Sequence, residues 1–218
     1  MTGPVRGNSE TPAAAVLLFG GRRVPRPLRG LPLLRPGGRA DLDAAVGPYR
    51  RLVVVGADAD LAALLTGLLR ADRLDVEVAY VPRRRTAATR AYRLPSGRRA
   101  ARRARRASAA RVPLIRDDAG WAIVGRAHWL PADGKALHGE AVVDDTGLFD
   151  GGVAGCRIEP TGALPGLRAR VRGRRWVPGR AAQLGCTGVI VVRDGVPAPR
   201  PARRSTFYRN VEGWLAVR

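Results

Sequence analysis

The chain has 218 residues, of which 45% are apolar and 5% aromatic, and its formal net charge at pH 7 is +21. This length and apolar fraction suffice to bury a sizeable core, which excludes wholesale disorder. The longest nearly uninterrupted apolar run, residues 13–19, is far shorter than the ~20 residues that cross a bilayer. Because no small-residue cleavage site follows this run, we interpret it as a buried strand of a cytoplasmic protein without a transmembrane segment.

Several common kinds of site are absent from the sequence. Cys156 and Cys186 lie far apart and form no CxxC pair, so neither a disulfide framework nor a zinc module is indicated. His128 and His138 form no HExxH motif, which argues against a histidine-based metallopeptidase. The sequence also contains no GxxxxGK[ST] loop and no GxSxG elbow.

Arginine carries the positive charge, since Lys135 is the only lysine. GC-rich codon usage explains the preference for arginine over lysine, but not the excess of basic over acidic residues. A positive surface potential should attract nucleic acid, anionic lipid or phosphorylated ligands.

The first half of the chain has the pattern of an α/β lobe. After the strand at 13–19, residues 20–39 are crowded with Gly, Pro and Arg and predict a loop, and a helix is expected at about 41–46. Apolar β-branched runs at 51–56 and 76–81 flank a tight turn and a helical repeat of leucines. We interpret this unit as βαβ, with a parallel sheet as the consequence.

An arginine-rich and alanine-rich stretch follows at 83–110. Because alanine is the best helix former, a helix is expected over 97–110, although its like charges at i,i+3 and i,i+4 weaken it. The apolar face of this helix would consist of alanines alone. We therefore expect it at the surface, packed against little else.

From residue 112 onward, short apolar runs alternate with turn signals, which predicts a mostly antiparallel β lobe. The predicted fold class is therefore α/β plus β. A parallel α/β lobe would span residues 13–111 and a β-rich lobe 112–218, and the closing strands could return to the first lobe. The expected strands of the second half are 121–124, 140–143, 153–158, 167–171, 188–192 and 214–217.

The turn Gly56-Ala57-Asp58-Ala59-Asp60 is the first candidate site. It lies between a strand and a helix, where the unpaired amides of a helix N-terminus bind phosphate groups. Asp58 and Asp60 could orient a phosphate-bound metal ion. The alternative is that one of them only caps the helix.

Two further candidate sites are charged segments. Arg83, Arg84, Arg85 and Thr86 begin a loop after a strand, where three guanidinium groups could clamp a phosphate; a solvated charge run is the alternative. The acidic segment that contains Asp144, Asp145 and Asp150 could coordinate Mg²⁺, although it lacks the DxDxDG spacing of a calcium loop and could equally be a plain β-turn.

The fourth candidate site is Asp194-Gly195, which follows an apolar run and is a strong signal for the turn of a β-hairpin.

Taken in order, the four candidate sites resemble the diacylglycerol kinase and sphingosine kinase family, whose fold is shared with NAD kinases. Residues 51–69 are similar to that family's strand, GGDGT turn and helix, with Gly56 and Asp58 on the first glycine and the aspartate of the motif. Three further segments resemble the family's GTGNDFARxLGLP, DDGLLD and closing Asp-Gly-Glu segments, namely 83–95, 139–158 and 191–214.

The chain departs from this family at the residues that contact nucleotide. Ala57 and Ala59 stand where the family has glycines whose missing Cβ lets backbone amides approach phosphates, and Asp60 stands in place of a threonine. Arginines replace the second glycine-rich segment at 83–87, and Val196 replaces the glutamate of the closing motif. The chain is also shorter than the family, with the loss expected between 125 and 138, where the lipid-binding β domain would be built.

The resemblance implies ATP and Mg²⁺ as cofactors and phosphorylation of a lipid hydroxyl, with Asp58 near the phosphates and Asp194 as the candidate base. Because the nucleotide loops are degenerate, we predict a weakly active or inactive relative that binds anionic or phosphorylated ligands. Its arginines at 83–106 would hold it peripherally at the inner face of a membrane. Two alternatives are a nucleic-acid-binding module that uses residues 98–106 and a structural partner protein held by the β half.

Overall fold

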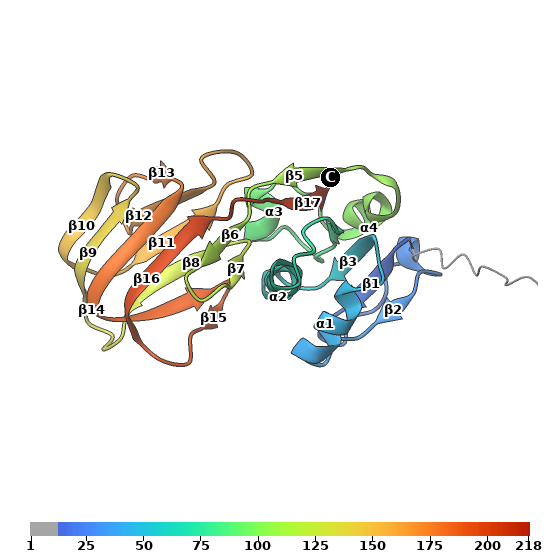
Figure 1. Ribbon diagram of the computed structural model, residues 1–218, viewed down its shortest axis with the longest axis horizontal. Helices are drawn as coiled ribbons and strands as arrows, with labels where there is room; N and C mark the ends of the chain where they lie inside the picture. Colours follow the sequence, from blue (N-terminus) through green and yellow to red (C-terminus); the bar gives the residue numbers. More distant parts are fainter. Residues whose placement is uncertain (1–12) are drawn as a thin grey trace, which may run out of the picture.

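The computed structural model describes residues 13–218, which form an α/β lobe and a β lobe side by side along the long axis of the molecule (Figure 1). The α/β lobe is built on a 6-stranded sheet, sheet A, and the β lobe on an 11-stranded sheet, sheet B. The predicted fold class, α/β plus β, is confirmed. Within the described residues, no helix is long and apolar enough to cross a membrane.

Sheet A consists of β1 (Ala15–Leu18), β2 (Leu33–Leu34), β3 (Arg51–Val55), β4 (Glu77–Tyr80), β5 (Ala109–Val112) and β17 (Trp214–Val217). The strand order is β2-β1-β3-β4-β17-β5, and every neighbouring pair is parallel except β17 and β5. The last strand of the chain therefore lies between two strands of the first lobe. The parallel pairing of β3 and β4 is the arrangement that the βαβ pattern predicts.

Helices cover both faces of sheet A. They are η1, a 3-10 turn (Arg26–Leu28), α1 (Arg39–Val46), α2 (Asp58–Arg70), α3 (Ala87–Ala91) and α4 (Gly97–Arg106). Side chains alternate across each strand, so Leu52 and Val54 of β3 pack with α2 on one face while Val53 packs with α4 on the other. The leucine repeat of α2 is buried in the first of these clusters.

Two expectations for this lobe need correction. The helix predicted over 97–110 ends at Arg106, because Ala107 has an extended backbone with ψ 150° and the chain then enters β5. Its buried alanines pack against strand residues and η1 rather than against little else, because small side chains allow close approach. The predicted loop at 20–39 also contains η1 and the short strand β2.

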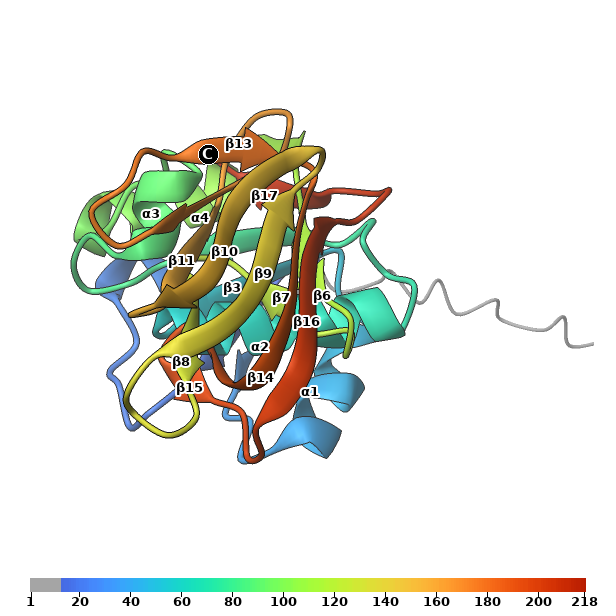
Figure 2. The ribbon, with the colours of Figure 1, turned by 90° about the vertical axis from the view of Figure 1, so that its left-hand side faces the viewer.

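Sheet B is entirely antiparallel, and its strands fold across the end of the molecule that faces the viewer in Figure 2. Its core includes Trp129 and Phe207, whose ring centroids are 5.9 Å apart. The strands are β6 (Ile115–Asp117), β7 (Ala122–Ile123), β8 (Ala127–Pro131), β9 (Leu137–Val143), β10 (Thr146–Val153), β11 (Cys156–Pro160), β12 (Leu167–Val171), β13 (Val177–Gly179), β14 (Ala181–Arg193), β15 (Val196–Pro197) and β16 (Ala202–Arg209).

The segment 125–138, where a loss was expected, contains β8 and the beginning of β9. β8 pairs with both β11 and β14, so it lies inside sheet B and not at its edge. The β lobe is therefore built over this segment.

A buried polar contact joins the two lobes. The Thr66 hydroxyl of α2 accepts a 3.0 Å hydrogen bond from the Ala122 amide of β7 and donates one of 2.8 Å to the Ala62 carbonyl. This hydrogen bond to Ala122 holds α2 against the β lobe. Within the α/β lobe, Tyr92, just after α3, packs edge to face on Trp214 of β17, with ring centroids 5.2 Å apart.

Candidate functional site

Two carboxylates from opposite lobes meet at Gly125, in the connection between β7 and β8. Asp58 begins α2, and Asp194 lies in the turn between β14 and β15. A Cβ atom on Gly125 would lie 2.7 Å from Asp58 Oδ2 and 2.9 Å from Asp194 Oδ1. Glycine is therefore required here, because any side chain would push the carboxylates apart.

Asp58 is held by groups of its own lobe. Its Oδ1 accepts a 2.8 Å hydrogen bond from the Tyr80 hydroxyl at the end of β4. Its Oδ2 accepts a 3.2 Å hydrogen bond from the Ala88 amide of α3. Burial, and then the nearby Asp58 charge, raise the pKa of Tyr80 above its ordinary value, so the hydroxyl keeps its proton and remains a donor.

Asp194 is bound by three backbone amides of the β7–β8 connection. Its Oδ1 accepts from the Gly125 and Arg126 amides at 2.7 and 2.9 Å, and its Oδ2 accepts from the Val124 amide at 2.9 Å. Burial raises the pKa of Asp194 to about 6, although the three amides oppose this shift; the Asp58 charge adds to it. This pKa lies close enough to neutral pH for the carboxyl group to exchange a proton there. The three hydrogen bonds also hold the β7–β8 connection in place.

A basic cavity lies at the carboxyl ends of β1, β3 and β4, and we call it the sheet-edge cavity. It has a volume of about 840 Å³ and is lined by Val55, Val81 and four arginines, Arg22, Arg23, Arg83 and Arg98. Ligands of parallel α/β proteins bind at this edge of the sheet. Guanidinium groups fit a phosphate chain, but within residues 13–218 no carboxylate lines this cavity to hold a Mg²⁺ ion.

Two other residues of the turn at 56–60, Asp60 and Gly56, determine how α2 begins. Asp60 Oδ2 accepts a 2.7 Å hydrogen bond from the Ala57 amide, so Asp60 caps the helix. A Cβ atom on Gly56 would lie 2.5 Å from this carboxylate oxygen. Gly56 therefore leaves room for this cap. The contacts of Asp60 are those of a residue that caps the helix, which was the alternative to a metal-orienting role.

The structure does not gather the three arginines of the next loop at one place. Arg83 lines the sheet-edge cavity, whereas Arg85 lines a separate cavity of about 340 Å³ beside α4. Arg84 is exposed. The Thr86 hydroxyl caps α3, accepting a 3.2 Å hydrogen bond from the Thr89 amide.

The acidic segment lies in the β9–β10 hairpin. The Asp144 carboxylate accepts hydrogen bonds from the Arg180 and Ala181 amides, both at 2.9 Å, which are the contacts of a turn residue. Asp145 is exposed, and Asp150 faces Glu140 across the hairpin. Across residues 13–218 no group of three or more His, Cys, Asp or Glu side chains could hold a metal ion. Magnesium binding by these aspartates stays a prediction.

Sequence reasoning missed Tyr80, Gly125 and two arginines of the sheet-edge cavity. Arg22 and Arg23 follow β1 after two glycines, so the rule that placed Arg83 at a strand end would also have placed them. Nothing in the sequence marks Gly125, because its role depends on two aspartates from distant segments.

No protein-family model and no curated protein matches the sequence. Solved structures do match the fold. A diacylglycerol kinase from Bacillus anthracis superposes with a TM-score of 0.72 and 11% sequence identity, covering 95% of this chain and 97% of that one. An NAD kinase from Archaeoglobus fulgidus, solved in complex with ATP, superposes with a TM-score of 0.65 and 12% identity, covering 94% and 93%. The chain therefore has the fold that diacylglycerol kinases and NAD kinases share.

Proposed function

We propose that this protein is a diacylglycerol kinase-like protein that binds a phosphorylated ligand, ATP among the candidates, at the sheet-edge cavity and transfers its phosphoryl group weakly or not at all. The observation that carries the proposal is the lining of this cavity by four arginines. The ATP-bound NAD kinase with the same fold supports a nucleotide as the ligand.

Three features support weak or absent transfer. Ala57 and Ala59 carry Cβ atoms where the resembling family has glycines, which hinders close contact between the backbone and phosphates. Asp194, the candidate base, has both carboxylate oxygens occupied by backbone amides. Val196 is 56% exposed and supplies no carboxylate. Each lost transition-state contact typically lowers the rate by about 10² to 10³.

Calorimetric titration of the purified protein with ATP, with and without Mg²⁺, tests the binding part. We expect the double variant Arg83→Gln, Arg98→Gln to lose affinity, since both guanidinium groups line the cavity. The matched control is Arg102→Gln, Arg172→Gln, which removes the same charge from exposed positions. Equal losses in both variants, or no ATP binding by the parent protein, would contradict nucleotide binding at this cavity.

The transfer part is tested with ATP, Mg²⁺ and diacylglycerol in mixed micelles. We expect lipid phosphorylation to stay at, or only slightly above, the level of a protein-free control. Robust phosphorylation that Asp58→Asn abolishes would show an active kinase and would refute this part of the proposal.

A further inference from the structure

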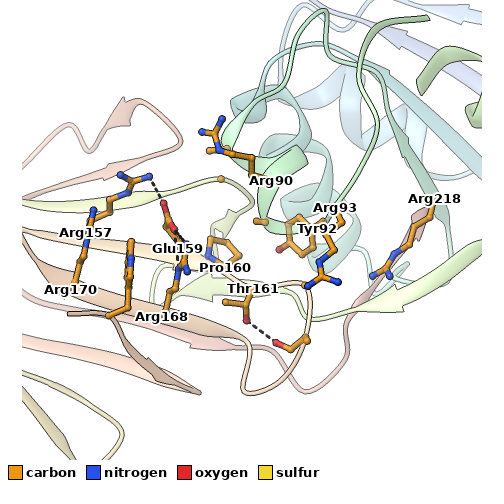
Figure 3. Close-up of a pocket in the computed structure, with 16 residues that line it drawn as sticks. Arg90, Tyr92, Arg93, Arg157, Glu159, Pro160, Thr161, Arg168, Arg170 and Arg218 are labelled. Atoms are coloured by element: carbon orange, nitrogen blue, oxygen red, sulfur yellow. Dashed lines mark hydrogen bonds and ion pairs between the residues drawn. The ribbon is translucent and has the colours of Figure 1, made fainter. Parts of the chain in front are cut away.

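A second basic cavity lies between the two lobes, and we call it the interlobe cleft (Figure 3). It has a volume of about 690 Å³ and extends from Gly125, beside the aspartate pair, to Trp176 in the β lobe. Among the described residues, none lines both this cleft and the sheet-edge cavity. The charged residues that line it are one glutamate, Glu159, and six arginines, Arg90, Arg93, Arg157, Arg168, Arg170 and Arg218.

The β-lobe wall of the cleft holds its guanidinium groups in an ordered array. In the β11–β12 pairing, Arg157 lies directly opposite Arg170, and Glu159 lies opposite Arg168. Like charges directly opposite one another destabilise a sheet, and here a single glutamate bridges Arg157 and Arg168. Arg170 is left without a carboxylate partner within residues 13–218. The sheet thus maintains an unneutralised positive charge on this wall.

Trp176 orders the same array. The guanidinium carbons of Arg168 and Arg170 lie 4.3 and 4.4 Å from the centroid of its indole ring, within the range of cation–π contacts. A planar group stacked on an aromatic ring loses little further freedom when it binds a ligand. The array is therefore preorganised for an anion rather than being a set of loose surface charges.

The opposite wall contributes further guanidinium groups from the α/β lobe. Arg90 of α3 and Arg93 just after it are exposed side chains that line the cleft, and neither has an ion-pair partner within residues 13–218. Figure 3 shows them on the side of the cleft that faces Arg157 and Arg170. Positive charges on both walls of a concave site focus the potential on anything between them. His128 lies opposite Arg157 in the β8–β11 pairing, and burial and then the charges of Arg157 and Arg126 lower its pKa.

Several unpaired guanidinium groups that approach from two sides match a compact dianion with oxygens on all sides. A phosphomonoester carries about 1.5 to 2 negative charges at pH 7 and offers three strong acceptor oxygens. A carboxylate carries one charge and two oxygens in one plane, which a single arginine can satisfy. We propose that the interlobe cleft binds the phosphomonoester group of a second ligand between Arg170 of the β lobe and Arg90 of the α/β lobe. The phosphomonoester could belong to a soluble metabolite or to a lipid headgroup.

Calorimetric titration with glycerol 3-phosphate and with inorganic phosphate tests this proposal. We expect binding by the parent protein, and about a tenfold loss of affinity for each of Arg90→Gln and Arg170→Gln, because each removes a hydrogen bond between charged groups. The double variant should bind more weakly than either single variant, and because both arginines contact the same phosphate group their effects should couple rather than simply add. The control Arg102→Gln, Arg172→Gln should bind like the parent, because neither residue lines the cleft.

Vesicle sedimentation distinguishes the two sources of the phosphate group. Phosphatidylcholine vesicles that contain phosphatidic acid present a phosphomonoester, whereas vesicles that contain phosphatidylglycerol present only a phosphodiester. Tighter binding to the first kind than to the second, with Arg90→Gln removing the difference, identifies a lipid headgroup. Binding of glycerol 3-phosphate with no preference between the two kinds of vesicle identifies a soluble ligand. Both results support the cleft as a phosphomonoester site.

Two results would overturn the proposal. One is the absence of phosphomonoester binding, or binding that the cleft variants leave unchanged. The other is tight binding of an oligonucleotide that depends on Arg90 and Arg170 and that glycerol 3-phosphate does not displace, which would make the cleft a nucleic-acid site. The result does not depend on the sheet-edge cavity, because Arg83→Gln, Arg98→Gln should weaken ATP binding and leave glycerol 3-phosphate binding intact. Thermal unfolding of each variant checks that it is folded.

Discussion

Tyr80 and Asp58 form a 2.8 Å hydrogen bond that joins the end of β4 to the start of α2. Because Tyr80 is buried and its raised pKa keeps it protonated at neutral pH, the hydroxyl remains a donor to Asp58, whose other carboxylate oxygen lies against Gly125. The carboxylate that could face a phosphoryl group is thus positioned by its own lobe before any ligand arrives.

Tyr80→Phe should destabilise the protein without changing its fold. The variant leaves Asp58 Oδ1 without its donor in a half-buried place, and the loss of a hydrogen bond to a charged group costs about 2 kcal/mol. Chemical denaturation measures this difference. Tyr49→Phe is the matched control, since no hydrogen bond of its hydroxyl is found within residues 13–218, and an equal loss there would contradict the role of the Tyr80–Asp58 bond.

Asp194 should make stability depend on pH in one direction. Its pKa is about 6 in the folded protein and 3.8 in the reference state, so the folded protein binds more protons between these values. The contribution of Asp194 to stability is therefore fully present below about pH 4 and is lost as the pH rises through 6. Asp194→Asn should lack this component, although it also loses acceptors for backbone amides.

The measurement is the melting temperature of the parent and of Asp194→Asn between pH 4 and 7. The difference between the two melting temperatures should shrink as the pH rises through this range. Asp145→Asn in the exposed β9–β10 turn is the control. A difference that grows with pH would contradict the raised pKa.

Thr66 should be important for the junction between the lobes. Thr66→Val keeps the shape of the side chain but leaves the Ala122 amide of β7 without its acceptor in the core. An unsatisfied buried amide costs about 1 to 3 kcal/mol. Urea denaturation should show this loss, whereas Thr66→Ser, which keeps the hydroxyl, should recover much of it. If the serine variant is no better than the valine variant, packing rather than the hydrogen bond holds the junction.

The outward face of α4 carries arginines on which the predicted membrane contact would depend. Its buried alanines fix the helix on sheet A, so its arginines project away from the core. Each basic side chain near an anionic surface contributes about 1 kcal/mol within a Debye length of about 8 Å. Replacing Arg99, Arg102 and Arg103 with Gln should reduce sedimentation with anionic vesicles and leave neutral vesicles unaffected.

The control for this experiment replaces Arg172, Arg175 and Arg203, which are exposed residues of the β lobe. Duplex DNA at the same salt concentration is the competing partner. If DNA binds far more tightly than anionic vesicles, and the α4 variant abolishes that binding, the helix is a nucleic-acid contact and the membrane prediction fails.

Local sequence patterns predicted the α/β half well because its helices and strands depend mainly on residues that are close together in the sequence. The leucine repeat of α2 and the β-branched run of β3 specify one helix face and one strand, and both formed where expected. The end of the helix at Arg106 was missed, because three of the four residues at 107–110 are alanines, which also favour helix. There the pairing of β5 with β17, more than a hundred residues away, determines the structure.

The candidate site was less predictable, because it depends on topology. The sequence singled out Asp58 and Asp194 separately, but only the packing of the lobes shows that both lie against Gly125. The arginines of the interlobe cleft come from several separate segments. On the β-lobe wall, their arrangement follows from the strand register, which sets Arg157 opposite Arg170 and which no short sequence window contains.

The position of β17 between β4 and β5 has a consequence for biosynthesis. While the chain emerges from the ribosome, β4 and β5 are complete long before the strand that must lie between them is made. The first lobe therefore has a gap in its sheet until residues 214–217 leave the exit tunnel. A released chain that is truncated before residue 214 contains every strand of sheet B but lacks β17, so it should have a protease-resistant β lobe attached to a protease-sensitive α/β lobe.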